Sequence, residues 1–105
     1  MLSGRITLVS VVVLAAMSVP ARAATIRILV DKLEFSPAVA SAKVGDTVEW
    51  VNKDALAHTA TARDGAFDVT LPPSKTVSSV LKKAGTVDYY CRFHPNMKAT
   101  LTIAP

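Results

Sequence analysis

Apolar and polar residues alternate along most of the chain from residue 24 onward. Alternation of this kind is the pattern of a half-buried β-strand, whose successive side chains point to opposite faces. The clearest run is 47–52, in which Val48 and Trp50 share one face and Glu49 and Val51 share the other. The predicted strands cover residues 24–31, 38–43, 47–52, 59–61, 67–70, 76–81, 86–91 and 99–103.

Turn-forming residues separate these runs, at Gly45, Gly65, Pro72 and Gly85 among others. The run 38–43 alternates least clearly and predicts an edge strand. No segment shows a convincing helical period or an internal repeat. Many short strands at this spacing indicate an all-β sandwich or barrel, and the pattern alone does not choose between the two.

Two aromatic residues are expected in the core of this sheet structure. Phe35 precedes Pro37, which disfavours a central strand position because proline lacks a backbone N–H. Trp50 has a large apolar surface that favours burial, and its indole N–H then needs a hydrogen-bond partner. We therefore interpret Trp50 as a core residue rather than as a functional one.

The first 23 residues have the organisation of a secretory signal peptide. Arg5 is followed by an apolar run over residues 6–19 and by Ala21-Arg22-Ala23, a small-residue cleavage box. The run is too short to favour a membrane anchor, which needs about 20 apolar residues. We predict cleavage after Ala23, a mature domain over 24–105, no stable membrane insertion after cleavage, and export to a bacterial periplasm.

The charge balance gives no support for nucleic-acid binding. Loss of Arg5 and Arg22 with the leader lowers Lys+Arg from 12 to 10 against 8 acids, so the formal charge falls from +4 to +2. The remaining cations are scattered rather than clustered on one stripe, as a nucleic-acid site would require. The length suits a single domain, which we expect to be a monomer.

Every soft or borderline metal ligand left in the mature chain belongs to one pattern. Cys91, His94 and Met97 follow one another at i, i+3 and i+6, and His58 lies upstream. This spacing could also mark one face of a helix. Pro95 argues against that, because proline inside a helix costs about 3 kcal/mol. The β-branched and aromatic flanks favour two strands joined by a loop that turns at Pro95-Asn96.

The donor set favours copper over other metals. Zinc has little use for a thioether, and its structural sites usually take four Cys or His ligands. A c-type haem needs two cysteines, and an iron–sulfur cluster needs more thiolates than the single Cys91. One thiolate, two imidazoles and a weak thioether are the ligands of a blue-copper site, which holds one ion as Cu(I) or Cu(II).

The segment Cys91-Arg92-Phe93-His94-Pro95-Asn96-Met97, with the distant His58, resembles the small blue copper proteins, or cupredoxins. Its short Cys-to-Met loop is more similar to that of the amicyanin group than to the plastocyanin and pseudoazurin groups. The resemblance covers the mature chain and implies a Greek-key β-sandwich. It also implies that His58, Cys91 and His94 are equatorial ligands, that Met97 is axial, and that one-electron transfer is the function.

Two positions depart from the family pattern. Thr59 stands where these proteins commonly have an asparagine that supports the cysteine loop, and Lys98-Ala99 follows Met97 where a glycine is common. Thr59 is therefore our candidate for a hydrogen-bonding residue next to the ligands.

The resemblance further implies that redox partners dock around the solvent edge of His94. Apolar residues that could form this surface are Leu56, Ala57, Pro73, Phe93 and Pro95. A periplasmic copper chaperone or buffer is the alternative function, since the same ligands suit Cu(I). An enzyme is not expected, because a catalytic copper cluster needs more histidines than two.

Overall fold

The computed structural model describes residues 3–13 and 22–105 of the chain. Residues 3–13 are exposed and have no regular secondary structure. Two parts of the predicted leader, residues 1–2 and 14–21, lie outside the described residues. Within the two described ranges, no helix has the length and apolar character needed to cross a membrane.

Nine strands form the domain, and the described residues contain no helix. They are β1 (Thr25–Asp31), β2 (Glu34–Ser36), β3 (Val39–Lys43), β4 (Thr47–Asn52), β5 (His58–Ala62), β6 (Asp68–Leu71), β7 (Thr76–Val80), β8 (Gly85–Tyr90) and β9 (Lys98–Ala104). Eight of them match the predicted strands to within two residues. The exception is β2, which the alternation does not predict because three residues are too few to show a period.

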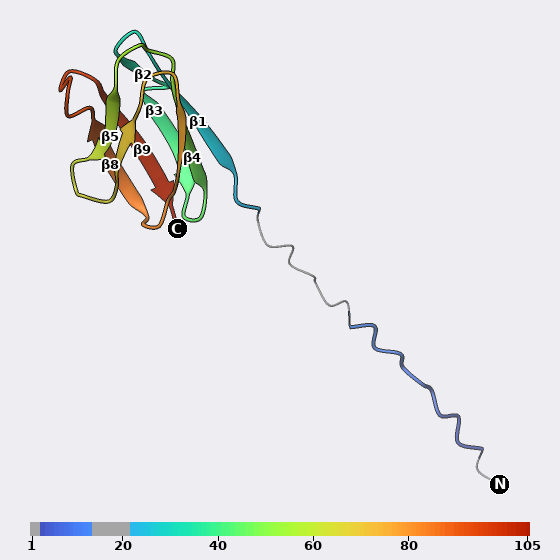
Figure 1. The fold of residues 1–105 in the computed structure, drawn as a ribbon. Helices are drawn as coiled ribbons and strands as arrows, with labels where there is room; N and C mark the ends of the chain where they lie inside the picture. Colours follow the sequence, from blue (N-terminus) through green and yellow to red (C-terminus); the bar gives the residue numbers. More distant parts are fainter. Residues whose placement is uncertain (1–2, 14–21) are drawn as a thin grey trace.

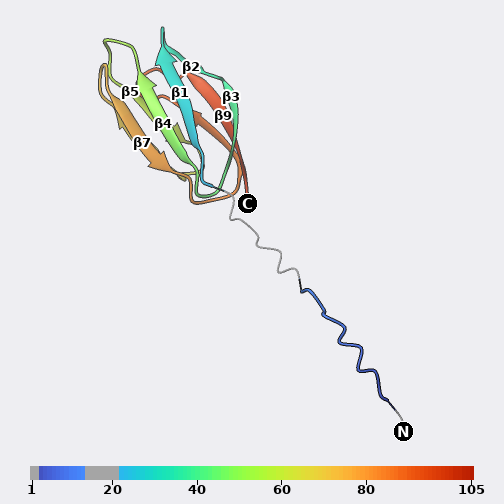
Figure 2. The same ribbon diagram turned by 90° about the vertical axis from the view of Figure 1, so that its right-hand side faces the viewer.

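The strands form two sheets that face each other, so the all-β sandwich is confirmed (Figure 1). One sheet has the order β2-β1-β4-β7 and the other the order β3-β9-β8-β5-β6. Figure 2 shows β1, β4 and β7 side by side in the first sheet. The chain passes repeatedly from one sheet to the other, so β1 pairs with β4, and β3 with β9, in parallel. The weakly alternating strand β3 lies at a sheet edge, as predicted.

The core between the sheets is built around aromatic residues. Trp50 on β4 and Tyr89 on β8 are fully buried, and their ring centroids are 5.1 Å apart. Phe35 packs edge-on against Tyr89 at 4.8 Å. Burial of Phe35 and Trp50 confirms both core predictions. The expected partner of the Trp50 N–H is not found among the described residues, and the Tyr89 hydroxyl is likewise buried without one.

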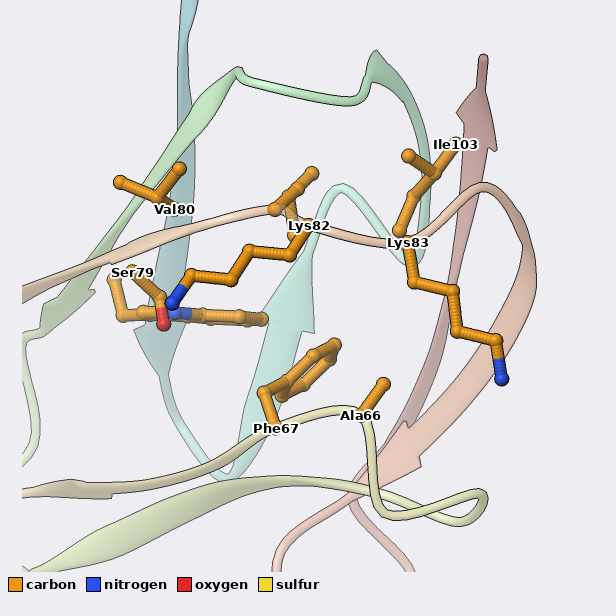
Figure 3. Close-up of a pocket in the computed structure, with 9 residues that line it drawn as sticks. Ala66, Phe67, Ser79, Val80, Lys82, Lys83 and Ile103 are labelled. Atoms are coloured by element: carbon orange, nitrogen blue, oxygen red, sulfur yellow. The ribbon is translucent and has the colours of Figure 1, made fainter.

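A cavity of about 510 Å³ lies at the end of the sandwich where β5, β7 and β9 finish. Phe67 and Ala66 lie on one side of it, and Val80 and Lys82 lie on the other (Figure 3). None of the predicted ligands lines this cavity.

Candidate metal centre

The fold brings three of the predicted ligands together at one end of the sandwich. The ligand atoms of His58, Cys91 and His94 all lie within 4.8 Å of one another. Nδ1 of His58 is 3.8 Å from Sγ of Cys91, and Nδ1 of His94 is 3.9 Å from it. Cys91 and His58 are fully buried, whereas His94 is partly exposed. One thiol and two ring nitrogens thus surround a space that can hold one ion.

The segment 91–97 forms the loop between β8 and β9, opposite the end of the sandwich where the C-terminus lies (Figure 1). The Cys91 N–H donates to the Met97 carbonyl at 3.1 Å, and the Met97 N–H donates to the His94 carbonyl at 2.9 Å. The second bond closes a turn over Pro95-Asn96, as predicted, because proline is preorganised for the second position of such a turn. Met97 is only 3% exposed, so the loop folds back into the buried site.

Asp54 holds the other side of the His58 ring. Oδ2 of Asp54 lies 2.7 Å from Nε2 of His58. Because an ionised carboxylate only accepts hydrogen bonds, the Nε2–H of His58 is the donor and Nδ1 carries the lone pair. That lone pair is on the Cys91 side, where a metal ion would bind. The carboxylate therefore selects the tautomer and the orientation that a ligand histidine needs.

Asp54 also fixes a turn between β1 and β2. Its carboxylate accepts the N–H groups of Lys32 and Leu33 at 2.8 and 3.1 Å. These two residues have φ angles of 53° and 62°, a region that non-glycine residues rarely adopt. Partial burial would raise the pKa of Asp54, but hydrogen bonds from Leu33, His58 and Lys32 lower it below its ordinary value. The carboxylate is therefore ionised and ties this turn to the metal centre.

Thr59 supports the loop at Cys91 through two hydrogen bonds. Its backbone N–H donates to Cys91 Sγ at 3.4 Å, and its hydroxyl oxygen accepts the Arg92 N–H at 2.8 Å. Thr59 is fully buried, so the Arg92 N–H has this hydroxyl in place of water. The hydroxyl thus takes the position in which the family's asparagine was expected to act.

The Thr59 hydroxyl is oriented by a chain of hydrogen bonds that ends on a carboxylate. Oγ1 of Thr61 lies 2.9 Å from Oγ1 of Thr59 and 2.7 Å from Oδ1 of Asp68. Because the carboxylate only accepts, Thr61 donates to Asp68, which leaves Thr59 to donate to Thr61. The bond from Thr61 is the main cause of a lowered Asp68 pKa, and the Arg92 charge adds to it.

Asn52 shapes the loop that delivers His58. It is 1% exposed, and its Nδ2 donates to the Leu56 and Leu71 carbonyls at 2.9 and 3.1 Å. Its Oδ1 accepts the Asp54 N–H at 2.9 Å. Sequence reasoning did not single out Asn52 or Asp54. The only available signal was an acid four residues before a candidate ligand histidine.

The side chains at the site fit copper. A buried thiol, two imidazole nitrogens, one of them on a ring held by Asp54, and a buried thioether in the same loop match the trigonal His2Cys set with a weak axial methionine. No carboxylate oxygen belongs to the three-residue cluster found in the described residues. Harder, oxygen-preferring ions such as Mg²⁺ or Ca²⁺ therefore have no suitable donors there.

Fold and site together define the small copper proteins of the cupredoxin type, and comparison with known proteins agrees. A family model described as a cupredoxin-like domain matches residues 4–103. The chain therefore belongs to the cupredoxin-like family, which confirms the resemblance noted in the ligand loop.

The similar proteins include amicyanins. The chain is 32% identical over 95 residues to the methylamine utilization protein MauL of Methylorubrum extorquens, covering 87% of this chain and 83% of that protein. It is 30% identical to the amicyanin of Paracoccus denitrificans, covering 72% of this chain and 64% of that protein. It is 29% identical to the amicyanin of Paracoccus versutus, covering 94% of this chain and 78% of that protein.

Comparison with solved structures also finds cupredoxins. A reduced Cu(I) form of an amicyanin mutant superposes with a TM-score of 0.66 at 28% identity, covering 75% of this chain and 81% of that one. A purple cupredoxin from Nitrosopumilus maritimus superposes with a TM-score of 0.66 at 24% identity, covering 75% of this chain and 99% of that one. The second likeness concerns the fold alone.

Proposed function

We propose that this chain is a periplasmic electron carrier with a single type 1 copper site. His58, Cys91 and His94 are the equatorial ligands and Met97 is the axial ligand. The observation that carries the proposal is the convergence of one buried thiol and two imidazole nitrogens within 4.8 Å. Copper bound by this set exchanges one electron between Cu(I) and Cu(II) with little rearrangement.

The chain's own residues provide the rigidity that such exchange requires. Asp54 holds the His58 ring, and Thr59 contacts the Cys91 sulfur and the backbone N–H of Arg92, the next residue. The Thr59 N–H also points at the sulfur, where it offsets the negative charge of a thiolate. Ligands fixed in this way stay in place in both oxidation states, which suits an electron carrier better than an enzyme.

Partners are proposed to dock on the apolar surface around His94. Leu56 and Phe93 are each 53% exposed, and Pro73 and Pro95 are exposed as well. His94 is the only one of the three clustered ligands that is partly exposed, so it is the shortest route from the site to a partner. Redox partners typically form small interfaces of under about 1,200 Å² in total. A monomer that presents this surface can form an interface of that size.

The export part of the proposal is supported by the predicted leader. Residues 1–23 are proposed to be a signal peptide and residues 24–105 the mature periplasmic domain. The physiological donor and acceptor are redox proteins of that compartment.

The test is a visible absorption spectrum of the copper-loaded, oxidised mature protein beside its Cys91→Ala variant. An intense blue or violet band that is lost in the variant establishes the bond between the Cys91 thiolate and copper. Repeated reduction and reoxidation should bleach and restore the band without loss of metal. A colourless protein that binds copper and releases it to an acceptor would instead support a copper chaperone.

A further inference from the structure

The turn between β3 and β4, at the opposite end of the sandwich from the metal centre, contains a buried carboxylate, that of Asp46. Asp46 is only 2% exposed. Its Oδ1 accepts the Ala24 N–H and its Oδ2 accepts the Lys43 N–H, each at 2.8 Å. No ion pair to Asp46 is found in the part of the chain that the structure describes. Buried charges in proteins are usually paired, so this arrangement calls for a cation.

The nitrogen of Ala24 becomes such a cation when the leader is removed. Ala24 is the first residue after the predicted cleavage point, so cleavage turns its amide N–H into an α-ammonium group. We propose that the Ala23–Ala24 bond is the processing site and that Asp46 is the receptor for the new amino terminus. Processing thus creates an ion pair between this ammonium group and the Asp46 carboxylate, just before the start of β1. This inference rests on the leader part of the proposed function and is independent of the copper site.

The surrounding backbone fixes the geometry of this pair. The Ala24 carbonyl accepts the Thr47 N–H at 3.0 Å, and the parallel pairing of β1 with β4 begins at the next residue, Thr25. Asp46 is itself held by its backbone, because its N–H donates to Lys43 and its carbonyl accepts the Leu81 N–H. An extended chain advances about 3.3 Å per residue. A chain that began one residue earlier or later would therefore place its charge away from the carboxylate.

Hydrogen bonds from the Ala24 and Lys43 N–H groups hold the pKa of Asp46 below its ordinary value, and the Lys43 charge acts in the same direction. The carboxylate is therefore ionised at neutral pH. Lys43 and Pro105 also line the small cavity beside Asp46. The side chain of Lys43 is therefore the competing cation at this turn.

The test compares copper-loaded, reduced chains that differ only at the amino terminus. One begins at Ala24, a second retains Ala23, and a third begins at an acetylated Ala24. The proposal predicts that the Ala24 amino group titrates above the range of about 7.7–8.0 seen for free α-amino groups, as followed by NMR of an isotope-labelled terminus. The chain that begins at Ala24 should also melt higher than the other two at pH 6, and this advantage should vanish as the amino group deprotonates.

Asp46→Asn should return the pKa of the Ala24 amino group to the ordinary range. Asp31→Asn, at an exposed acid on β1, should leave that pKa raised. If Asp46→Asn does not fold, the three chains with Asp46 intact still decide the matter. An ordinary titration together with equal melting of the three chains overturns the ion pair. Mass spectrometry of the exported protein tests the bond separately, since a first residue other than Ala24 overturns the processing assignment and leaves the copper proposal untouched.

Discussion

Nε2 of His58 lies 2.7 Å from Oδ2 of Asp54, on the side of the ring that faces away from Cys91. This contact links the metal centre to the turn between β1 and β2, because the same carboxylate accepts the Lys32 and Leu33 N–H groups. The orientation of the buried His58 ring thus depends on Asp54, which lies on the side of the ring away from the metal centre.

Replacement of Asp54 by alanine should weaken copper binding by about 10–100-fold, the usual effect of losing a hydrogen-bond partner of a ligand histidine. The His58 ring would lose its fixed tautomer, and the turn at Lys32 would lose its acceptor. Competition titration with a copper chelator measures the effect. Asp31→Ala, at an exposed acid on β1, is the control and should bind copper normally.

The variant Thr59→Val should lower the free energy of unfolding by about 1–3 kcal/mol, because it leaves the Arg92 N–H without its acceptor while preserving side-chain volume. The variant Thr59→Ser keeps the hydroxyl and should lose less. Urea denaturation measures both. Equal stability of the two variants would show that the hydroxyl does not support the loop. The Thr59 backbone N–H remains in each case, so the blue band should persist.

Phe93→Glu and Leu56→Glu should slow electron self-exchange between oxidised and reduced copies without altering the visible spectrum. Both side chains are 53% exposed, so the fold should tolerate them, but like charges would then meet across the docking surface. Exchange broadening in NMR spectra measures the rate. Val80→Glu is the matched control, since Val80 is 55% exposed and lies at the far end of β7. A spectrum that collapses would mean that these residues support the site instead.

The copper-loaded protein should melt at a higher temperature than the metal-free protein, because an ion that binds only the native state stabilises it. At a free-ligand concentration of 1,000 times Kd the gain is about 4.1 kcal/mol. Calorimetry at measured copper occupancy tests this, with Cys91→Ala as the variant in which the increase should be reduced. Equal melting temperatures of the loaded and metal-free wild-type protein would contradict a native-state site.

Acid should destabilise the metal-free protein through Asp46 and Asp68. Hydrogen bonds from Ala24 and Lys43 lower the pKa of Asp46, and a hydrogen bond from Thr61 is the main cause of the lowered pKa of Asp68. In the unfolded chain both groups protonate near pH 3.9, above their folded values. Their stabilisation is therefore complete above that pH and is lost as the pH falls through the folded values. Denaturation curves from pH 6 to pH 2 should show this loss below about pH 4, with a smaller pH dependence in Asp68→Asn.

The sequence alone determined the strands and the chemical identity of the candidate ligands. Alternation is a local property, so eight of the nine strands could be predicted, and only the three-residue strand β2 was too short to show it. The pattern around Cys91 and Pro95 predicted a turning loop between two strands, and the structure has that loop. Ligand chemistry depends on residue type, which a sequence states directly.

Only the tertiary structure decided which residues support those ligands. Asp54 meets Lys32 and Leu33 across 22 and 21 residues, and Thr59 meets Arg92 across 33. Ala24 meets Asp46 across 22 residues. Such contacts depend on the order of strands in two sheets, which periodicity within a strand does not encode. Burial of Trp50 followed from its apolar surface, which the sequence states directly. That its N–H finds no partner among the described residues depended on what packs around it.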